Sequence, residues 1–213
     1  MIGYSHKKGF TNMKLYKVIV TTLLLGTMCT NVAFGIENNS ILGIEEFPNT
    51  QSLQAIITPA ETQQSNIAKY LKQHTNEQNL EVFLTWRNTI NSSLSQNNNY
   101  RELLAKELHS EEAVKTVQNQ LSKTGLYLLN SEGKYKLAIN YDKIYKLYGK
   151  HIPADWALYL KDLSIEQKCS PNILPDKEQN LVMWEDFANT YPNFEEIYVI
   201  YEKMQHYEKD YIK

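Results

Sequence analysis

Cysteine is almost absent from this chain of 213 residues, which contains only Cys29 and Cys169. Cys29 lies in the N-terminal leader described below. Removal of that leader would leave Cys169 alone, and a single thiol cannot form an internal disulfide. An exported domain without a disulfide has to be stabilised by its hydrophobic core. A chain of this length is long enough to bury one such core.

Long hydrophobic runs are also missing. The most apolar stretch, Val18–Gly26, is well short of the roughly 20 residues that span a bilayer. It follows the basic residues Lys14 and Lys17, and a weaker stretch then ends in Ala33–Gly35, which places small residues at positions −3 and −1 of a cleavage site. We therefore predict a cleavable secretory signal peptide at 1–35, with 1–12 as a possible upstream extension, and no membrane span after cleavage.

Positive charge is scarce once this leader is removed. The leader holds four lysines and no acidic residue, so the remainder has 18 lysines and arginines against 24 acidic residues and a net charge of −6. Nucleic acids and anionic lipid surfaces attract clustered positive charge. We therefore expect an acidic protein that binds neither of them.

Motifs for phosphate binding, metal binding and nucleophilic catalysis are missing as well. The eight glycines form neither a GxGxxG nor a GxxxxGK[ST] motif, and no histidines are spaced as metal ligands. Cys169 lies among serine and proline residues with no neighbouring base that would activate its thiol. The sequence therefore indicates no catalytic residue, no metal ligand and no cofactor.

What the chain does contain is helical periodicity. Residues 36–57 lack a sustained period, and we expect a flexible, extended or disordered lead-in there, followed by one helical domain at 58–213. Thr58 as a cap and Pro59 in the first turn predict the first helix start. Further helices are predicted at Asn79–Leu94, Tyr100–Leu108, Ser110–Lys123 and Leu181–Tyr191.

A last helix is predicted to begin at Asn193, with Glu196 completing a capping box. Its inward stripe is expected to include Tyr198 and Tyr201. The segment Cys169–Gln179, with its prolines, is interpreted as a loop.

The period changes after Gly125. Leu126–Leu129 and Tyr135–Ile139 are short β-type runs, and the five residues between them include Gly133, which is typical of a hairpin turn. The predicted fold is therefore mainly α, a single helical domain with one small two-stranded β-hairpin at 126–139.

The most specific stretch is Asn140–Leu163, which reads as two short helices that meet at a corner. Gly149 is expected to end the first helix in a left-handed conformation. Pro153 is expected in the first turn of the second helix. Aromatic side chains recur at helical spacing on both helices. Together with one tryptophan farther along the chain, they form the candidate binding surface: Tyr141, Tyr145, Tyr148, Trp156, Tyr159 and Trp184.

We expect an exported protein, periplasmic or extracellular, that binds a protein or glycan through this tyrosine- and tryptophan-rich surface without catalysis. Three alternatives stay open. A cell-wall or glycan hydrolase would use a carboxyl group of raised pKa, and Glu185 beside Trp184 is its candidate general acid. A structural envelope component would have no exposed aromatic patch. A membrane-tethered regulator would keep its N-terminus.

Overall fold

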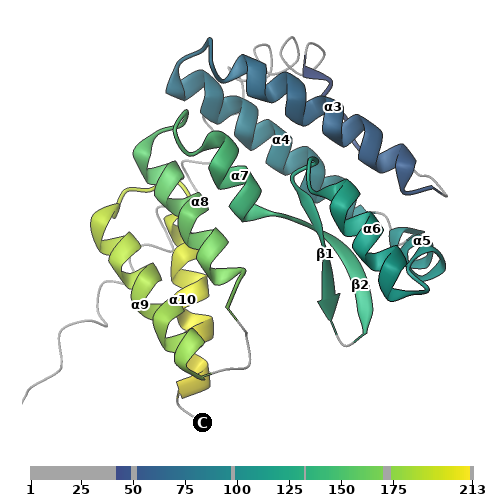
Figure 1. Ribbon diagram of the computed structural model, residues 1–213. Coiled ribbons are helices and arrows are strands. Elements are labelled where there is room, and N and C mark those ends of the chain that lie inside the picture. The colour runs from purple at the N-terminus through teal and green to yellow at the C-terminus, as the bar shows by residue number, and fades with distance from the viewer. Residues whose placement is uncertain (1–41, 49–51, 97–98, 132, 170–173, 212–213) are drawn as a thin grey trace, which may run out of the picture.

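The computed structural model describes residues 42–48, 52–96, 99–131, 133–169 and 174–211. The predicted signal peptide lies outside these residues. The described chain has eight helices and one antiparallel hairpin, which confirms the predicted mainly α fold with one two-stranded hairpin (Figure 1). In order, the elements are α3 (Gln54–Tyr70), α4 (Asn76–Gln96), α5 (Asn99–Glu107), α6 (Glu111–Leu121), β1 (Leu126–Ser131), β2 (Lys134–Ile139), α7 (Tyr141–Tyr148), α8 (Ala154–Glu166), α9 (Leu174–Thr190) and α10 (Ile197–Tyr211).

The first of these helices starts earlier than predicted. α3 begins at Gln54, so Pro59 lies inside the helix rather than in its first turn. A proline there removes one backbone hydrogen bond and disfavours the helix. Ile56 and Ile57 are almost completely buried, and their burial offsets that cost. The predicted start at Thr58 was wrong because apolar burial outweighed the proline signal.

The described part of the predicted lead-in is packed against the helices. Leu42, Ile44 and Phe47 are at most 5% exposed and belong to the hydrophobic core. The Phe47 amide donates to Ser93 Oγ at 3.0 Å, which ties this segment to α4. Residues 42–48 therefore contribute to the folded body.

The hairpin pairs β1 with β2 in antiparallel register from Leu126↔Ile139 to Ser131↔Lys134. Leu126, Leu137 and Ile139 are buried, whereas Lys134 and Lys136 of β2 are exposed. β1 lies against α6 and β2 against α5 and α4. The hairpin therefore packs against helices, and it lies at the position in the chain that the sequence predicted.

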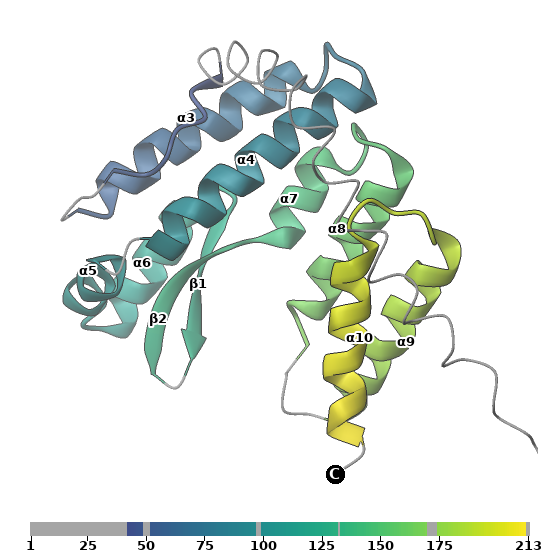
Figure 2. The same ribbon diagram turned by 180° about the vertical axis from the view of Figure 1, so that it is seen from behind.

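The helices form two groups that the hairpin and α7 connect. Figures 1 and 2 show the first group, α3 and α4, running beside each other above the hairpin. The second group, α8, α9 and α10, lies together at the other side of the molecule. α7 packs on α8, and α9 packs on both α8 and α10. One continuous core joins both groups, and its largest fully buried side chains are Trp86, Trp184, Tyr148, Phe83 and Phe187.

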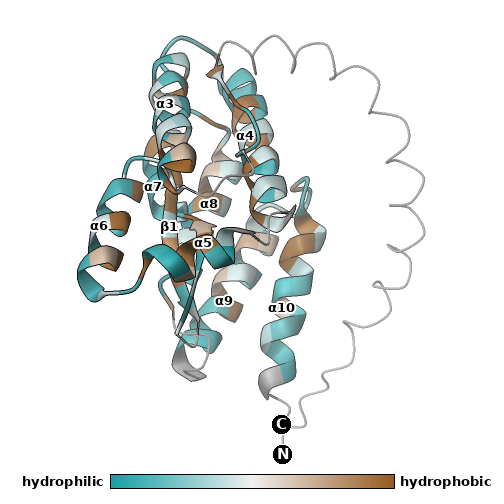
Figure 3. Ribbon diagram, turned by 90° about the vertical axis from the view of Figure 1, so that its right-hand side faces the viewer, coloured by the Kyte–Doolittle hydropathy of each residue, from teal (hydrophilic) through white to brown (hydrophobic). Residues whose placement is uncertain are grey.

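The C-terminal helices also differ in detail from the prediction. α9 begins at Leu174, so Pro175 lies in its first turn instead of in a loop. α10 begins at Ile197, and the predicted cap at Asn193 is replaced by two turns of non-helical backbone. Figure 3 shows α10 hydrophobic in its first turns and hydrophilic toward its end.

Candidate functional site

The six aromatic residues of the predicted binding surface lie mostly in the interior. Tyr148 and Trp184 are 0% exposed, Trp156 is 2% exposed and Tyr159 is 4% exposed. Tyr141 and Tyr145 are half-buried and pack against the same core. The four buried rings present no surface to a partner in this structure. A helical stripe of aromatic residues looks the same in sequence whether it lines a groove or fills a core.

These rings pack edge-on or tilted against phenylalanines from other segments of the chain. Tyr148 meets Phe83 with ring centroids 5.2 Å apart, and Trp156 meets Phe194 at 4.8 Å. Tyr159 lies 5.2 Å from the same Phe194. Such tilted pairs are worth about 0.5–1.5 kcal/mol beyond their buried area. The aromatic corner therefore joins α4, α7, α8 and the segment before α10 into one core.

The backbone of the corner deviates from the predicted pattern at both ends. Gly149 caps α7 with φ of −58°, so it is right-handed and the left-handed prediction was wrong. A Cβ at this glycine would lie 2.7 Å from the Tyr145 ring, so the position has no room for a side chain. Pro153 caps α8 one residue before the helix begins. Asn79 Nδ2 donates to the His151 carbonyl at 2.9 Å and holds the corner against α4.

Arg87, an unexpected charge on the apolar stripe of α4, has its partner in Glu196. Its two terminal nitrogens donate to the two Glu196 oxygens at 3.0 and 2.5 Å. The guanidinium also lies 5.3 Å from the Trp156 ring and 5.7 Å from the Phe83 ring. A two-bond pair with ring contacts suits arginine and not lysine. Glu196, predicted as part of a helix cap, instead anchors the start of α10.

A second polar cluster centres on Glu166 at the end of α8. Its carboxylate accepts hydrogen bonds from Trp184 Nε1 at 3.1 Å, Lys203 Nζ at 2.5 Å and the Tyr207 hydroxyl at 2.5 Å. Burial, and next the hydrogen bond to Glu166, raise the pKa of Tyr207. Three charge-assisted bonds to one acceptor hold α9 and α10 against α8.

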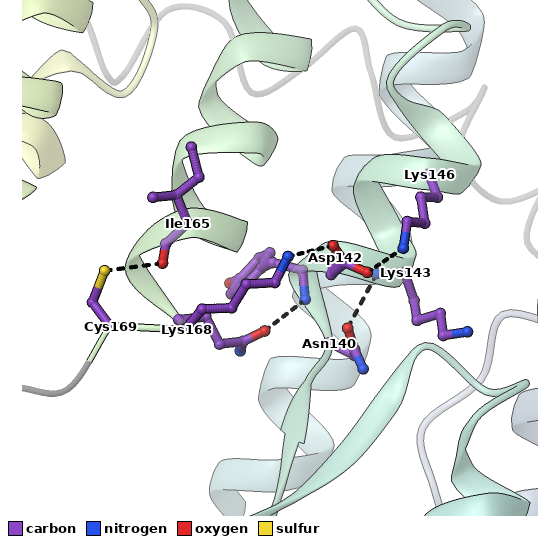
Figure 4. Close-up of polar contacts among 9 residues, drawn as sticks. Asn140, Asp142, Lys143, Lys146, Ile165, Lys168 and Cys169 are labelled. Atoms are coloured by element: carbon purple, nitrogen blue, oxygen red, sulfur yellow. Dashed lines mark hydrogen bonds and ion pairs between the residues drawn. The ribbon is translucent and has the colours of Figure 1, made fainter.

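Figure 4 shows a third polar cluster, in which Lys146 and Lys168 extend toward Asp142 from α7 and from the turn after α8. Their hydrogen bonds, first that of Lys146, lower the pKa of Asp142 to about 2.

Cys169 donates to the Ile165 carbonyl at 3.4 Å. Burial, followed by the charges of Asp176 and Glu166, raises the pKa of this thiol. Cys169 is therefore protonated at neutral pH and unsuited to nucleophilic attack.

Two tyrosines that the sequence placed inward are exposed instead. Tyr198 is 57% exposed and Tyr201 is 46% exposed, one turn apart on α10. The prediction was wrong because α10 turns Ile200, which is completely buried, toward the core. The run Ile197, Ile200, Met204 and Tyr207 has the spacing of an alternative inward stripe and could have revealed this.

Among the described residues, no group of three or more His, Cys, Asp or Glu side chains is arranged to hold a metal ion. No helix in the same part of the chain is long and apolar enough to cross a membrane. In comparisons with known proteins, no family model, no curated protein and no solved structure matches the chain significantly.

Proposed function

We propose that this chain is an exported, non-enzymatic binding protein whose contact surface is the outer face of α10. The observation that carries the proposal is the exposure of Tyr198 and Tyr201, at 57% and 46%, on adjacent turns. A tyrosine ring offers a flat apolar face and a hydroxyl with little rotamer entropy to lose, which suits contacts with proteins and glycans. The half-buried Tyr141 and Tyr145 are candidate additional contacts.

The anchoring of α10 supports this assignment. Glu196 beside its start is paired with Arg87, and Lys203 and Tyr207 bind Glu166 on the inner face. A helix held at both ends presents its exposed rings in a fixed geometry. Pre-organised contact residues lose less conformational entropy when a partner binds.

The test is a double variant, Tyr198→Ser with Tyr201→Ser, immobilised and offered glycans and the extracellular and periplasmic fractions of the source cells. We expect partner capture by the wild-type protein and its loss in the double variant, with an unchanged circular dichroism spectrum. Ile165→Ser is the matched control, because Ile165 on α8 is exposed to a similar degree, 41%. Equal capture by wild type and the double variant contradicts the proposal.

A second candidate, a glycan hydrolase, is favoured by Asp162 on α8. Burial, and to a smaller extent the charges of Asp186 and Glu166, raise the pKa of Asp162 to about 6. A carboxyl group of raised pKa beside a second carboxylate is what a general acid requires. Asp162 fits this role better than the exposed Glu185. A zymogram that the wild type clears and Asp162→Asn does not would support hydrolysis over binding.

A further inference from the structure

An open groove of about 640 Å³ lies between α8 and α9, two helices that pack side by side (Figures 1 and 2). Along α9 its lining recurs every fourth residue, at Glu178, Val182, Asp186 and Thr190. A span of 12 residues corresponds to about 18 Å of helix at 1.5 Å per residue. The groove is therefore elongated, with the length of a short helical segment.

The middle of the groove is apolar. Phe187, which is 1% exposed, and the half-buried Leu158 and Met183 lie within it. Val182 beside them is 50% exposed, which makes it one of the most exposed large apolar side chains among the described residues. Removal of this apolar surface from water by a bound partner would stabilise the complex.

The charged groups that line the groove are all negative. Asp162, Glu178 and Asp186 line it, and no lysine, arginine or histidine does. Lys161 is the neighbour of Asp162 on α8, and its side chain lies outside the lining. A groove with three carboxylates and no cation favours a positively charged occupant.

The burial of Asp162 adds a second observation to the charge of this lining. The residue is 5% exposed, and among the described residues its carboxylate has neither a hydrogen bond nor an ion pair. A carboxylate that is largely shielded from water and has no partner is costly. Since Asp162 lines the groove, a cation that enters the groove would supply the missing partner.

We propose that the α8–α9 groove docks a helical segment of a partner protein that carries a lysine or arginine between apolar side chains. The cation pairs with Asp162, and the neighbouring apolar side chains cover Val182 and Phe187. The length of the groove favours such a segment over a compact amine. This inference concerns a second surface and does not rest on the tyrosines of α10.

The test uses a fluorescent amphipathic peptide of about 14 residues, long enough to fill the groove as a helix, with leucines on one face and a single central lysine. A second peptide has norleucine in place of the lysine. We expect the lysine peptide to bind the wild-type protein and to lose about tenfold in affinity for Asp162→Asn. The norleucine peptide should bind more weakly and be insensitive to that substitution.

Glu185→Gln is the matched control, because Glu185 is an exposed acid on α9 outside the groove lining, and its effect should stay within about twofold. Val182→Ser, at a half-exposed position, should weaken both peptides alike. Retained far-UV circular dichroism shows that each variant is folded.

Equal losses for Asp162→Asn and Glu185→Gln would overturn the proposal, as would equal binding of both peptides. Binding of spermidine or Ca²⁺ that depends on Asp162, with no peptide binding, would assign the groove to a small cation instead. Self-association of the chain that Asp162→Asn abolishes would assign it to a second copy.

Discussion

Arg87 on α4 and Glu196 beside the start of α10 form a two-bond ion pair across 109 positions of sequence. The pair is largely shielded from water, with the side chains 12% and 20% exposed. Burial disfavours the charged guanidinium, but the hydrogen bonds to Glu196 and next its charge outweigh burial and raise the pKa of Arg87. This contact connects the first group of helices to the last helix of the chain.

Removal of one partner should therefore be strongly destabilising. We expect Arg87→Met to lower the free energy of unfolding by about 3–5 kcal/mol, because it leaves Glu196 unpaired and largely shielded from water. Urea unfolding measures this loss. Arg101→Met on the exposed side of α5 is the control and should cost less than about 0.5 kcal/mol. The double variant Arg87→Met with Glu196→Leu should recover part of the loss, and a fully additive result would contradict a direct pairing.

A comparison of Gly125 with Gly133 distinguishes the cost of backbone strain from the cost of steric overlap. Both have left-handed φ, +74° and +79°, so alanine should cost each position about 1 kcal/mol in strain. A Cβ at Gly125 would lie 2.9 Å from Ile144 Cδ1, whereas one at Gly133 meets nothing within 4 Å. We expect Gly125→Ala to lose about 1–3 kcal/mol more than Gly133→Ala in thermal or urea unfolding. Equal losses would mean that the neighbours of Gly125 yield freely.

Tyr148 and Tyr207 differ in what their hydroxyl groups contact. The hydroxyl of Tyr148 is buried with no hydrogen-bond partner among the described residues, and burial raises its pKa. We expect Tyr148→Phe to leave stability unchanged or to raise it by up to about 1 kcal/mol.

Tyr207→Phe is the matched comparison, because it removes the hydrogen bond to Glu166. It should lower the free energy of unfolding by about 1.5–3 kcal/mol, the range for bonds to charged groups. Differential scanning calorimetry on both variants measures the contrast. Destabilisation by Tyr148→Phe would indicate that its hydroxyl is hydrogen-bonded after all.

Asp162 should make stability depend on pH. Its pKa of about 6 in the folded protein exceeds the usual 3.8, so the folded state binds the proton more tightly and loses stability as pH rises through 6. The full shift would be worth about 3 kcal/mol, and solvent in the open groove should reduce this to about 1 kcal/mol. Asp162→Asn should thus be more stable than wild type at pH 7.5 and equal to it near pH 4.

Asp142→Asn is the control, and its effect on stability at neutral pH should have the opposite sign. The lysines that lower the pKa of Asp142 to about 2 stabilise its charged form, so the substitution should destabilise at neutral pH. That loss should disappear as pH falls below about 2. Thermal melts across pH 2–8 follow both effects, and parallel curves for the two variants would contradict the assigned directions.

Local patterns predicted most of the fold. Ser110 caps α6 and accepts from the Ala113 amide at 3.1 Å, as its place before two glutamates predicts. The turn around Gly133 set the position of the hairpin, and the strands extend one or two residues beyond the prediction. Such features depend on a few neighbouring residues, and sequence alone shows them.

The candidate site was harder to predict because it depends on which side of each helix faces inward. Tyr198 and Tyr201 lie outward because Ile200 and the Glu196 pair fix the rotation of α10. Tyr148 lies inward because Phe83 and Trp86 pack against it. These contacts join residues far apart in the chain, and no local period encodes them. The α8–α9 groove likewise needs both helices in place.

Because Trp184 shares the Glu166 carboxylate with Lys203 and Tyr207 of α10, its fluorescence should be sensitive to the position of this helix. Its indole nitrogen shares the carboxylate with Tyr207, and the Lys203 ammonium lies 5.2 Å from its ring centre. Lifting the last helix would remove Lys203 and Tyr207 from beside the indole and admit water, which would shift its emission to the red. With Trp86 and Trp156 changed to phenylalanine, the single remaining tryptophan would report the docking of this helix without any attached dye.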